Sequence, residues 1–171
     1  DAGQTERYAA RAIAAAPDDQ MVEGICWASR GAAVLLGGDA AEAVEPYARG
    51  MAILARLPHA EPAGLRALWP LLLASLGDHR AARAIEEARR LGVGAIRHNR
   101  SLIGYAEAVL AGRAGQRQRA NQLAAGCDVG FANCEAWGEL ARFCAAPAAL
   151  ADGWGDPRAW LVRCPPTFTG S

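Results

Sequence analysis

Four glycines recur at a nearly constant interval along this chain. Gly38, Gly77, Gly115 and Gly155 are separated by 39, 38 and 40 residues, and Asp follows three of them. A glycine can end one helix in the left-handed conformation, and the Asp after it can cap the next helix. A fixed interval of this length is typical of proteins built from stacked helical hairpins.

Alanine stands five residues after each of the first three glycines, at Ala43, Ala82 and Ala120. At this distance each alanine lies about one turn inside the second helix of its hairpin. A small side chain there lets two helices approach closely, because the distance between packed helices depends on the side chains at the contact. We therefore expect these three alanines to be buried.

Hydrophobic spacing and the breaks at glycine and proline predict an all-α chain. Pro46 and Pro70 fall inside expected helices, where proline removes a hydrogen-bond donor, so we expect kinks or a helix that starts near Pro46. The first helix lacks a preceding partner and is interpreted as the second helix of a hairpin. The second expected helix runs from a cap at Asp18 or Asp19 to residue 36. The other expected helices cover residues 4–16, 40–56, 63–76, 79–91, 97–111, 116–125 and 133–145, a loosely helical 147–151 and a stub at 157–163. We expect one helical-repeat domain over 1–163 and an irregular tail at 164–171.

Composition excludes several classes of function. The 171 residues include 18 Arg, 18 acidic residues and no Lys, so the formal net charge is zero and the whole chain has no attraction for nucleic acid or anionic membranes. No apolar run reaches membrane-spanning length and no signal-peptide pattern opens the chain. Five cysteines without the spacing of a secreted framework favour a reducing, cytoplasmic setting. Because the chain starts without Met in helical sequence, we expect it to be a piece of a longer protein.

The first complete repeat resembles a tetratricopeptide repeat. Trp27 stands at the signature tryptophan, Gly31 at the small position of the first helix, Ala43 at the alanine of the second helix and Tyr47 at the aromatic that follows. The interval of 38 to 40 residues exceeds the usual 34, which indicates a divergent relative with longer loops. The resemblance implies a right-handed superhelix of helical hairpins.

The run at 148–161 resembles the closing helical-repeat segment of large ATP-dependent LuxR-type transcriptional regulators from GC-rich bacteria. In that family an ATPase precedes the repeats, a helix-turn-helix follows them, and the repeats sense an inducer or a partner protein. This chain has no lysine for a phosphate-binding loop and continues into Cys164-Pro165-Pro166 rather than into a DNA-reading domain. We therefore expect neither ATP hydrolysis nor specific DNA binding from the chain itself.

The cysteines and the arginines offer weak signals of chemistry. Cys127, Cys134 and Cys144 are spaced by seven and ten residues, without a C-x-x-C pair or a histidine nearby in sequence, which favours ordinary thiols over zinc. The basic segment Arg113–Arg119 lacks interleaved aromatic residues and indicates a solvated face more than a nucleic-acid site. His59 and Glu61 form the nearest approach to a catalytic pair, but they lie in a proline-flanked linker, so we expect no enzyme.

Two further patterns remain open. His98, Asn99 and Arg100 begin a helix and could bind an anion at its positive end, or they could form a solvated cap. Trp27, Trp69, Trp137 and Trp160 stand where hairpins pack and are interpreted as core residues, whereas Trp154 has no assigned role.

We expect the chain to be a non-catalytic recognition segment without a metal or cofactor. The first hypothesis is a sensor or interaction segment of a LuxR-type regulator, with a protein or small-molecule inducer in a concave groove. The alternative is a free-standing scaffold that binds a peptide or partner protein. An uncapped repeat end also favours a homodimer. The residues expected to face the groove are Ala28, Ala32, Leu35, Ala67, Leu71, Tyr105, Val109 and Arg113.

Overall fold

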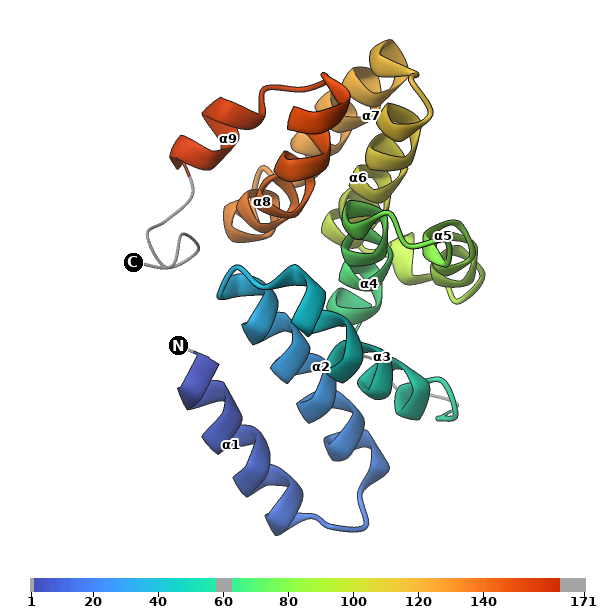
Figure 1. Cartoon of the computed structure of the whole chain (residues 1–171). Coiled ribbons are helices and arrows are strands. Elements are labelled where there is room, and N and C mark those ends of the chain that lie inside the picture. Colours follow the sequence, from blue (N-terminus) through green and yellow to red (C-terminus); the bar gives the residue numbers. More distant parts are fainter. Residues whose placement is uncertain (1, 58–62, 164–171) are drawn as a thin grey trace. The chain divides into compact units, whose positions relative to one another are not determined.

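The structure, a computed structural model, describes residues 2–57 and 63–163 (Figure 1). Every regular element within those residues is a helix, so the expected all-α class is confirmed. The helices are α1 (Ala2–Ala15), α2 (Gln20–Leu36), α3 (Ala40–Leu54), α4 (Ala63–Leu76), α5 (Ala81–Arg90), the short η1 (Val93–Ala95), α6 (Arg97–Arg113), α7 (Arg117–Gly130), α8 (Glu135–Asp152) and α9 (Pro157–Arg163).

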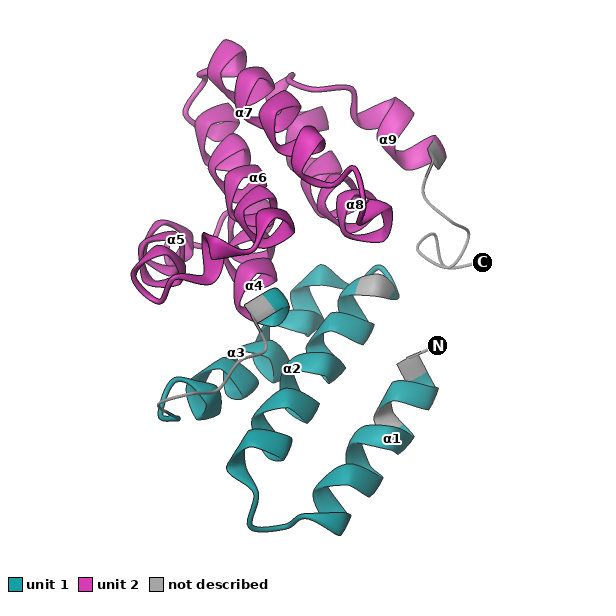
Figure 2. Ribbon diagram, turned by 180° about the vertical axis from the view of Figure 1, so that it is seen from behind, with its two compact units in different colours: residues 1–65, 165–171 teal, residues 66–164 magenta. Residues whose placement is uncertain are grey.

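The chain divides into two compact units where the sequence predicts a single domain (Figure 2). Among the described residues, unit 1 comprises 2–57 and 63–65, and in it α2 packs against both α1 and α3. Unit 2 comprises residues 66–164 and is built around α6, which contacts α5, η1, α7 and α8. The boundary falls between Leu65 and Arg66, in the first turn of α4.

The periodic glycines adopt the left-handed conformation that their spacing predicts. The φ angle is 96° at Gly38, 72° at Gly77, 76° at Gly115 and 66° at Gly155. Only glycine adopts this region without a steric cost, so each turn depends on the missing side chain. The cap after the first turn is also confirmed, because Asp39 accepts a hydrogen bond of 2.9 Å from the backbone N–H of Glu42.

The second hairpin departs from this pattern. Asp78 accepts a hydrogen bond of 2.8 Å from the backbone N–H of Arg80 instead of capping a helix, and α5 begins later than predicted, at Ala81. Ala82 is exposed, and its predicted burial is wrong, whereas Ala81 and Ala84 are buried. The main contacts of α5 are with α6 and η1.

The other two alanines behave as predicted. Ala43 and Ala120 are completely buried, each four residues after the N-cap position of its helix. In both helices the N-cap position directly follows the glycine, although only Asp39 caps through its side chain. The alanine rule therefore holds only where no additional turn separates the glycine from the helix.

Prolines lie inside three helices without ending them. Pro46 is within α3 and Pro70 within α4, so α3 starts at its Asp39 cap and not at the proline. α8 likewise continues through Pro147, where the sequence predicts a break after residue 145. An interior proline costs about 3 kcal/mol, and in α8 the buried residues on both sides of Pro147 offset that cost by tertiary packing.

The burial of the tryptophans differs from the expectation. Trp154 is the buried one, at 2 % exposure, and it packs edge-on against Trp160 with ring centroids 5.7 Å apart. A Cβ atom on Gly112 of α6 would lie only 2.2 Å from the indole nitrogen of Trp154. The indole therefore occupies the space that a side chain at Gly112 would need, and the turn after α8 is anchored on α6.

Glycines also set the spacing between α2 and α3 in unit 1. A Cβ atom on Gly50 would lie 2.5 Å from the backbone nitrogen of Ala28, and one on Gly31 would lie 2.8 Å from that of Tyr47. Tyr47 itself is fully buried, and its hydroxyl donates a hydrogen bond of 2.7 Å to the carbonyl of Leu65. The two backbones are thus in direct contact.

We predict that Gly50→Ala lowers the free energy of unfolding by about 1 to 3 kcal/mol, because the new methyl group would overlap backbone atoms that cannot rotate away. The matched control is Gly126→Ala in α7, where nothing lies within 4 Å of the added Cβ. There we expect a gain of about 0.5 to 1 kcal/mol from the higher helix propensity of alanine. Chemical unfolding followed by circular dichroism measures both, and equal effects would contradict the predicted contact.

Candidate functional site

The structure places most of the residues expected to line a groove in the core. A buried side chain is packed against other protein atoms, so it is not free to contact a ligand on an open surface. Ala32 is half-buried, and the only exposed member of the set is Arg113. Those with at most 2 % exposure are Ala28 and Leu35 in unit 1 and Ala67, Leu71, Tyr105 and Val109 in unit 2.

Two arginines of the basic segment hold the ends of neighbouring helices. Arg113 donates hydrogen bonds to the carbonyls of Ala74 (3.1 Å) and Ser75 (2.7 Å), in the last turn of α4. Arg117 donates one of 2.9 Å to the carbonyl of Asp152, the last residue of α8. The final carbonyls of a helix lack partners within the helix and carry partial negative charge, so a cation there is stabilising. These arginines therefore have a structural role.

A cavity of about 470 Å³ lies in unit 2 beside the segment that joins α5 to α6. Its size is within the range of small-molecule sites. Arg89 of α5 and Glu107 of α6 form an ion pair at it, and the Nε of Arg100 donates a hydrogen bond of 3.0 Å to the carbonyl of Gly94. The lining residues are Arg89, Gly92, Gly94, Ala95, Arg100, Ile103, Gly104 and Glu107.

The sequence did not predict this cavity, although two of its glycines carry a local signal. Gly92 ends α5 with a φ of 70°, and Gly94 follows two residues later, so a stretch without side chains precedes the helix that bears Arg100. Because glycine has no side chain, this stretch leaves backbone atoms exposed at the cavity. The pairing of Arg89 with Glu107 carries no local signal, because it depends on how α5 packs against α6.

The three residues expected to form an anion site have different surroundings. Arg100 lines the cavity, whereas the ring of His98 stacks on that of Trp137, with centroids 5.8 Å apart and planes inclined by 15°. Asn99 is completely buried, and its side-chain oxygen and nitrogen have no hydrogen-bond partner among the described residues. Successive residues of a helix point about 100° apart, which explains the divergence.

The fold also brings His98 close to a cysteine, which the sequence spacing did not indicate. The Nδ1 atom of His98 lies 3.9 Å from the Sγ atom of Cys134, 36 positions along the chain. Cys134 is the residue before the first turn of α8 and is half-buried. Within residues 2–57 and 63–163, no group of three or more His, Cys, Asp or Glu side chains is arranged to hold a metal ion.

A second polar cluster joins α6, α7 and α8. Asp128 accepts hydrogen bonds from the hydroxyl of Tyr105 (2.8 Å) and from Nη1 of Arg142 (2.7 Å). Burial and the adjacent carboxylate raise the pKa of Tyr105, and burial raises the pKa of the Cys127 thiol to about 12. Both groups therefore keep their protons at neutral pH, and the cluster links helices rather than supplying a nucleophile.

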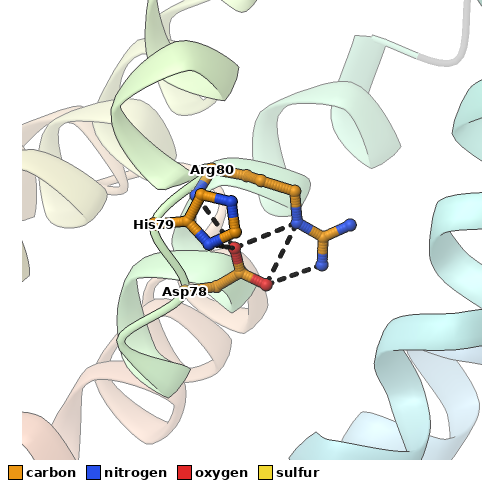
Figure 3. A network of polar contacts seen from close by, with 3 residues as sticks. All are labelled: Asp78, His79 and Arg80. Atoms are coloured by element: carbon orange, nitrogen blue, oxygen red, sulfur yellow. Dashed lines mark hydrogen bonds and ion pairs between the residues drawn. The ribbon is translucent and has the colours of Figure 1, made fainter.

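The turn between α4 and α5 contains a compact ion pair (Figure 3). Asp78 accepts hydrogen bonds from the Nε (3.0 Å) and Nη2 (2.6 Å) atoms of Arg80 in addition to its backbone N–H. These hydrogen bonds hold the pKa of Asp78 at about 2, below its ordinary value of 3.8. His79 also lies 3.6 Å from the carboxylate, but its side chain is 93 % exposed. The cluster fixes the turn and offers no enclosed site.

We predict that this turn contributes stability that is lost in acid. The lowered pKa of Asp78 means that the folded chain favours the carboxylate, so the contribution is present above pH 3.8 and disappears as the pH falls towards 2. Asp78→Asn should therefore flatten the decline of the unfolding midpoint over that window. Asp18→Asn, in a different turn, is the control. Parallel declines in the wild type and in Asp78→Asn would contradict the prediction.

None of the helices among the described residues is long and apolar enough to cross a membrane. Comparison of this chain with protein families, with curated proteins and with solved structures finds no match. The function must therefore be inferred from the cavity, the helix ends and the polar clusters themselves.

Proposed function

We propose that this chain is a non-catalytic recognition segment that binds a small anionic inducer in the cavity beside α6. The cavity is the observation that carries this proposal. Its size suits a small molecule, and its wall combines exposed glycine backbone with a few charged groups, as ligand sites commonly do. The expected groove residues do not support a ligand site, since most of them are buried.

The charges at the cavity indicate the kind of ligand. Arg89 is already paired with Glu107, so the cavity holds one balanced pair and, in addition, Arg100. Arg100 uses its Nε atom for the carbonyl of Gly94, and its terminal nitrogens have no hydrogen bond or ion pair within the described residues. A guanidinium group held in this way favours a carboxylate or a phosphate group, which it can bind through two parallel hydrogen bonds.

The repeat architecture supports a wider context. We propose that the hairpins form a tetratricopeptide-like superhelix and that the chain is the cytoplasmic sensor segment of a LuxR-type regulator. The four left-handed glycine turns and the close contact of Gly31 with Tyr47 support the helical-repeat part of the proposal. A ligand would then bias the regulator between states by binding one state more tightly.

Binding of a simple anion tests the cavity. We predict that citrate or inorganic phosphate raises the thermal midpoint of the chain and that Arg100→Gln abolishes most of the shift. The control is Arg119→Gln, because Arg119, in the first turn of α7, is exposed and among the described residues is bonded only to Gln116. No shift with either anion, or an equal loss in the control, would contradict a ligand site at Arg100.

We also predict that the chain alone neither hydrolyses ATP nor binds duplex DNA specifically. It lacks the lysine of a phosphate-binding loop, and its zero net charge provides no general attraction for DNA. Any weak binding through the basic segment should be independent of sequence and should fall steeply with salt. Anisotropy with labelled duplexes and a phosphate-release assay measure both properties. A complex that survives competitor DNA at moderate salt would count against this assignment.

A further inference from the structure

Cys134 and His98 form a thiol and imidazole pair that the recognition function does not use. Their Sγ and Nδ1 atoms are 3.9 Å apart, within reach of a sulfur hydrogen bond. The imidazole is oriented by its stack on Trp137, one turn into α8. A nucleophile beside a base that a third group orients is the arrangement found where side chains are activated for reaction.

The position of Cys134 in α8 adds to this arrangement. Cys134 occupies the N-cap position, and its carbonyl accepts the first backbone hydrogen bonds of the helix, from Trp137 (3.0 Å) and Gly138 (3.3 Å). Its side chain makes no capping hydrogen bond. Negative charge is favoured at this end of a helix.

The other described cysteines are less accessible than Cys134. Cys26, Cys127 and Cys144 are buried, whereas Cys134 is half-buried. Burial raises the pKa of Cys26 and raises that of Cys127 to about 12, so both remain protonated thiols at neutral pH. These three buried cysteines therefore serve as controls for the reactivity of Cys134.

We propose that Cys134 is a modification site, where His98 activates the thiol for exchange with a small disulfide such as oxidised glutathione. This inference is independent of the cavity and stands whether or not the cavity binds a ligand. The partial cover over Cys134 favours a small disulfide over a protein partner. The modification would lie at the contact between α6 and α8, two helices that pack together in unit 2.

The exchange requires no further reactant. With its own proton on Nε2, His98 accepts the thiol proton at Nδ1, and the Cys134 thiolate attacks one sulfur of the disulfide. A new bond forms between Sγ and that sulfur while the original S–S bond breaks. The departing thiolate takes the proton from the imidazolium, so one thiol and one disulfide are converted into a mixed disulfide and a free thiol.

The experiment measures the rate of glutathione addition at each cysteine. The full chain carries Cys164→Ser, because Cys164 lies outside the described residues, and is treated with oxidised glutathione at neutral pH before peptide mapping by mass spectrometry. We expect Cys134 to react at least about tenfold faster than Cys26, Cys127 and Cys144. Equal rates at Cys134 and at the buried cysteines would overturn the proposal.

The role of His98 is tested by substitution and by rescue. His98→Gln should slow the reaction at Cys134 about tenfold, and added imidazole should restore part of the rate, whereas the exposed His79→Gln should leave it unchanged. An unchanged rate in His98→Gln, or a slow rate that imidazole does not restore, would overturn the assignment of His98. If His98→Gln does not fold, the difference in rate among the wild-type cysteines decides the proposal.

Discussion

Close approach of helices at glycine positions is the constraint on which both units depend. In unit 1 a single Cβ on Gly50 would collide with the backbone of α2, and in unit 2 a Cβ on Gly104 would lie 2.4 Å from the sulfur of Cys127. The indole of Trp154 likewise occupies the space that a side chain at Gly112 would need. Because interiors are close-packed and do not yield, these positions fix how near each pair of helices lies. The other side chains then pack between helices whose separation these glycines determine.

Charge is used mainly at the ends of helices. Arg113 and Arg117 compensate the exposed carbonyls of α4 and α8, and Asp78 with Arg80 fixes the turn before α5. Two guanidinium groups of the basic segment, those of Arg113 and Arg117, are therefore directed at the protein's own backbone. Arg100 differs from these arginines, because it lines a cavity and its terminal nitrogens have no hydrogen-bond partner among the described residues.

The first two turns of α6 carry both proposed sites. Arg100 belongs to the wall of the cavity, whereas His98, two residues earlier, lies against Cys134 and Trp137 at the start of α8. The start of α6 therefore contributes residues to the cavity and to the contact with α8. Between these two residues, Asn99 is buried, and its side-chain amide has no hydrogen-bond partner in the described part of the chain.

The sequence by itself determined the features that depend on a few consecutive residues. The helical class, the left-handed turns at the four periodic glycines and the cap at Asp39 follow from local sterics and local hydrogen bonds, and they were predictable. Only the tertiary structure decided the rest. The Arg113 and Arg117 bonds span 39 and 35 positions, and the approach of His98 to Cys134 spans 36, so no short pattern records them. The burial of the expected groove residues and the exposure of Ala82 depend likewise on helix register and packing, which side chains distant in sequence establish together.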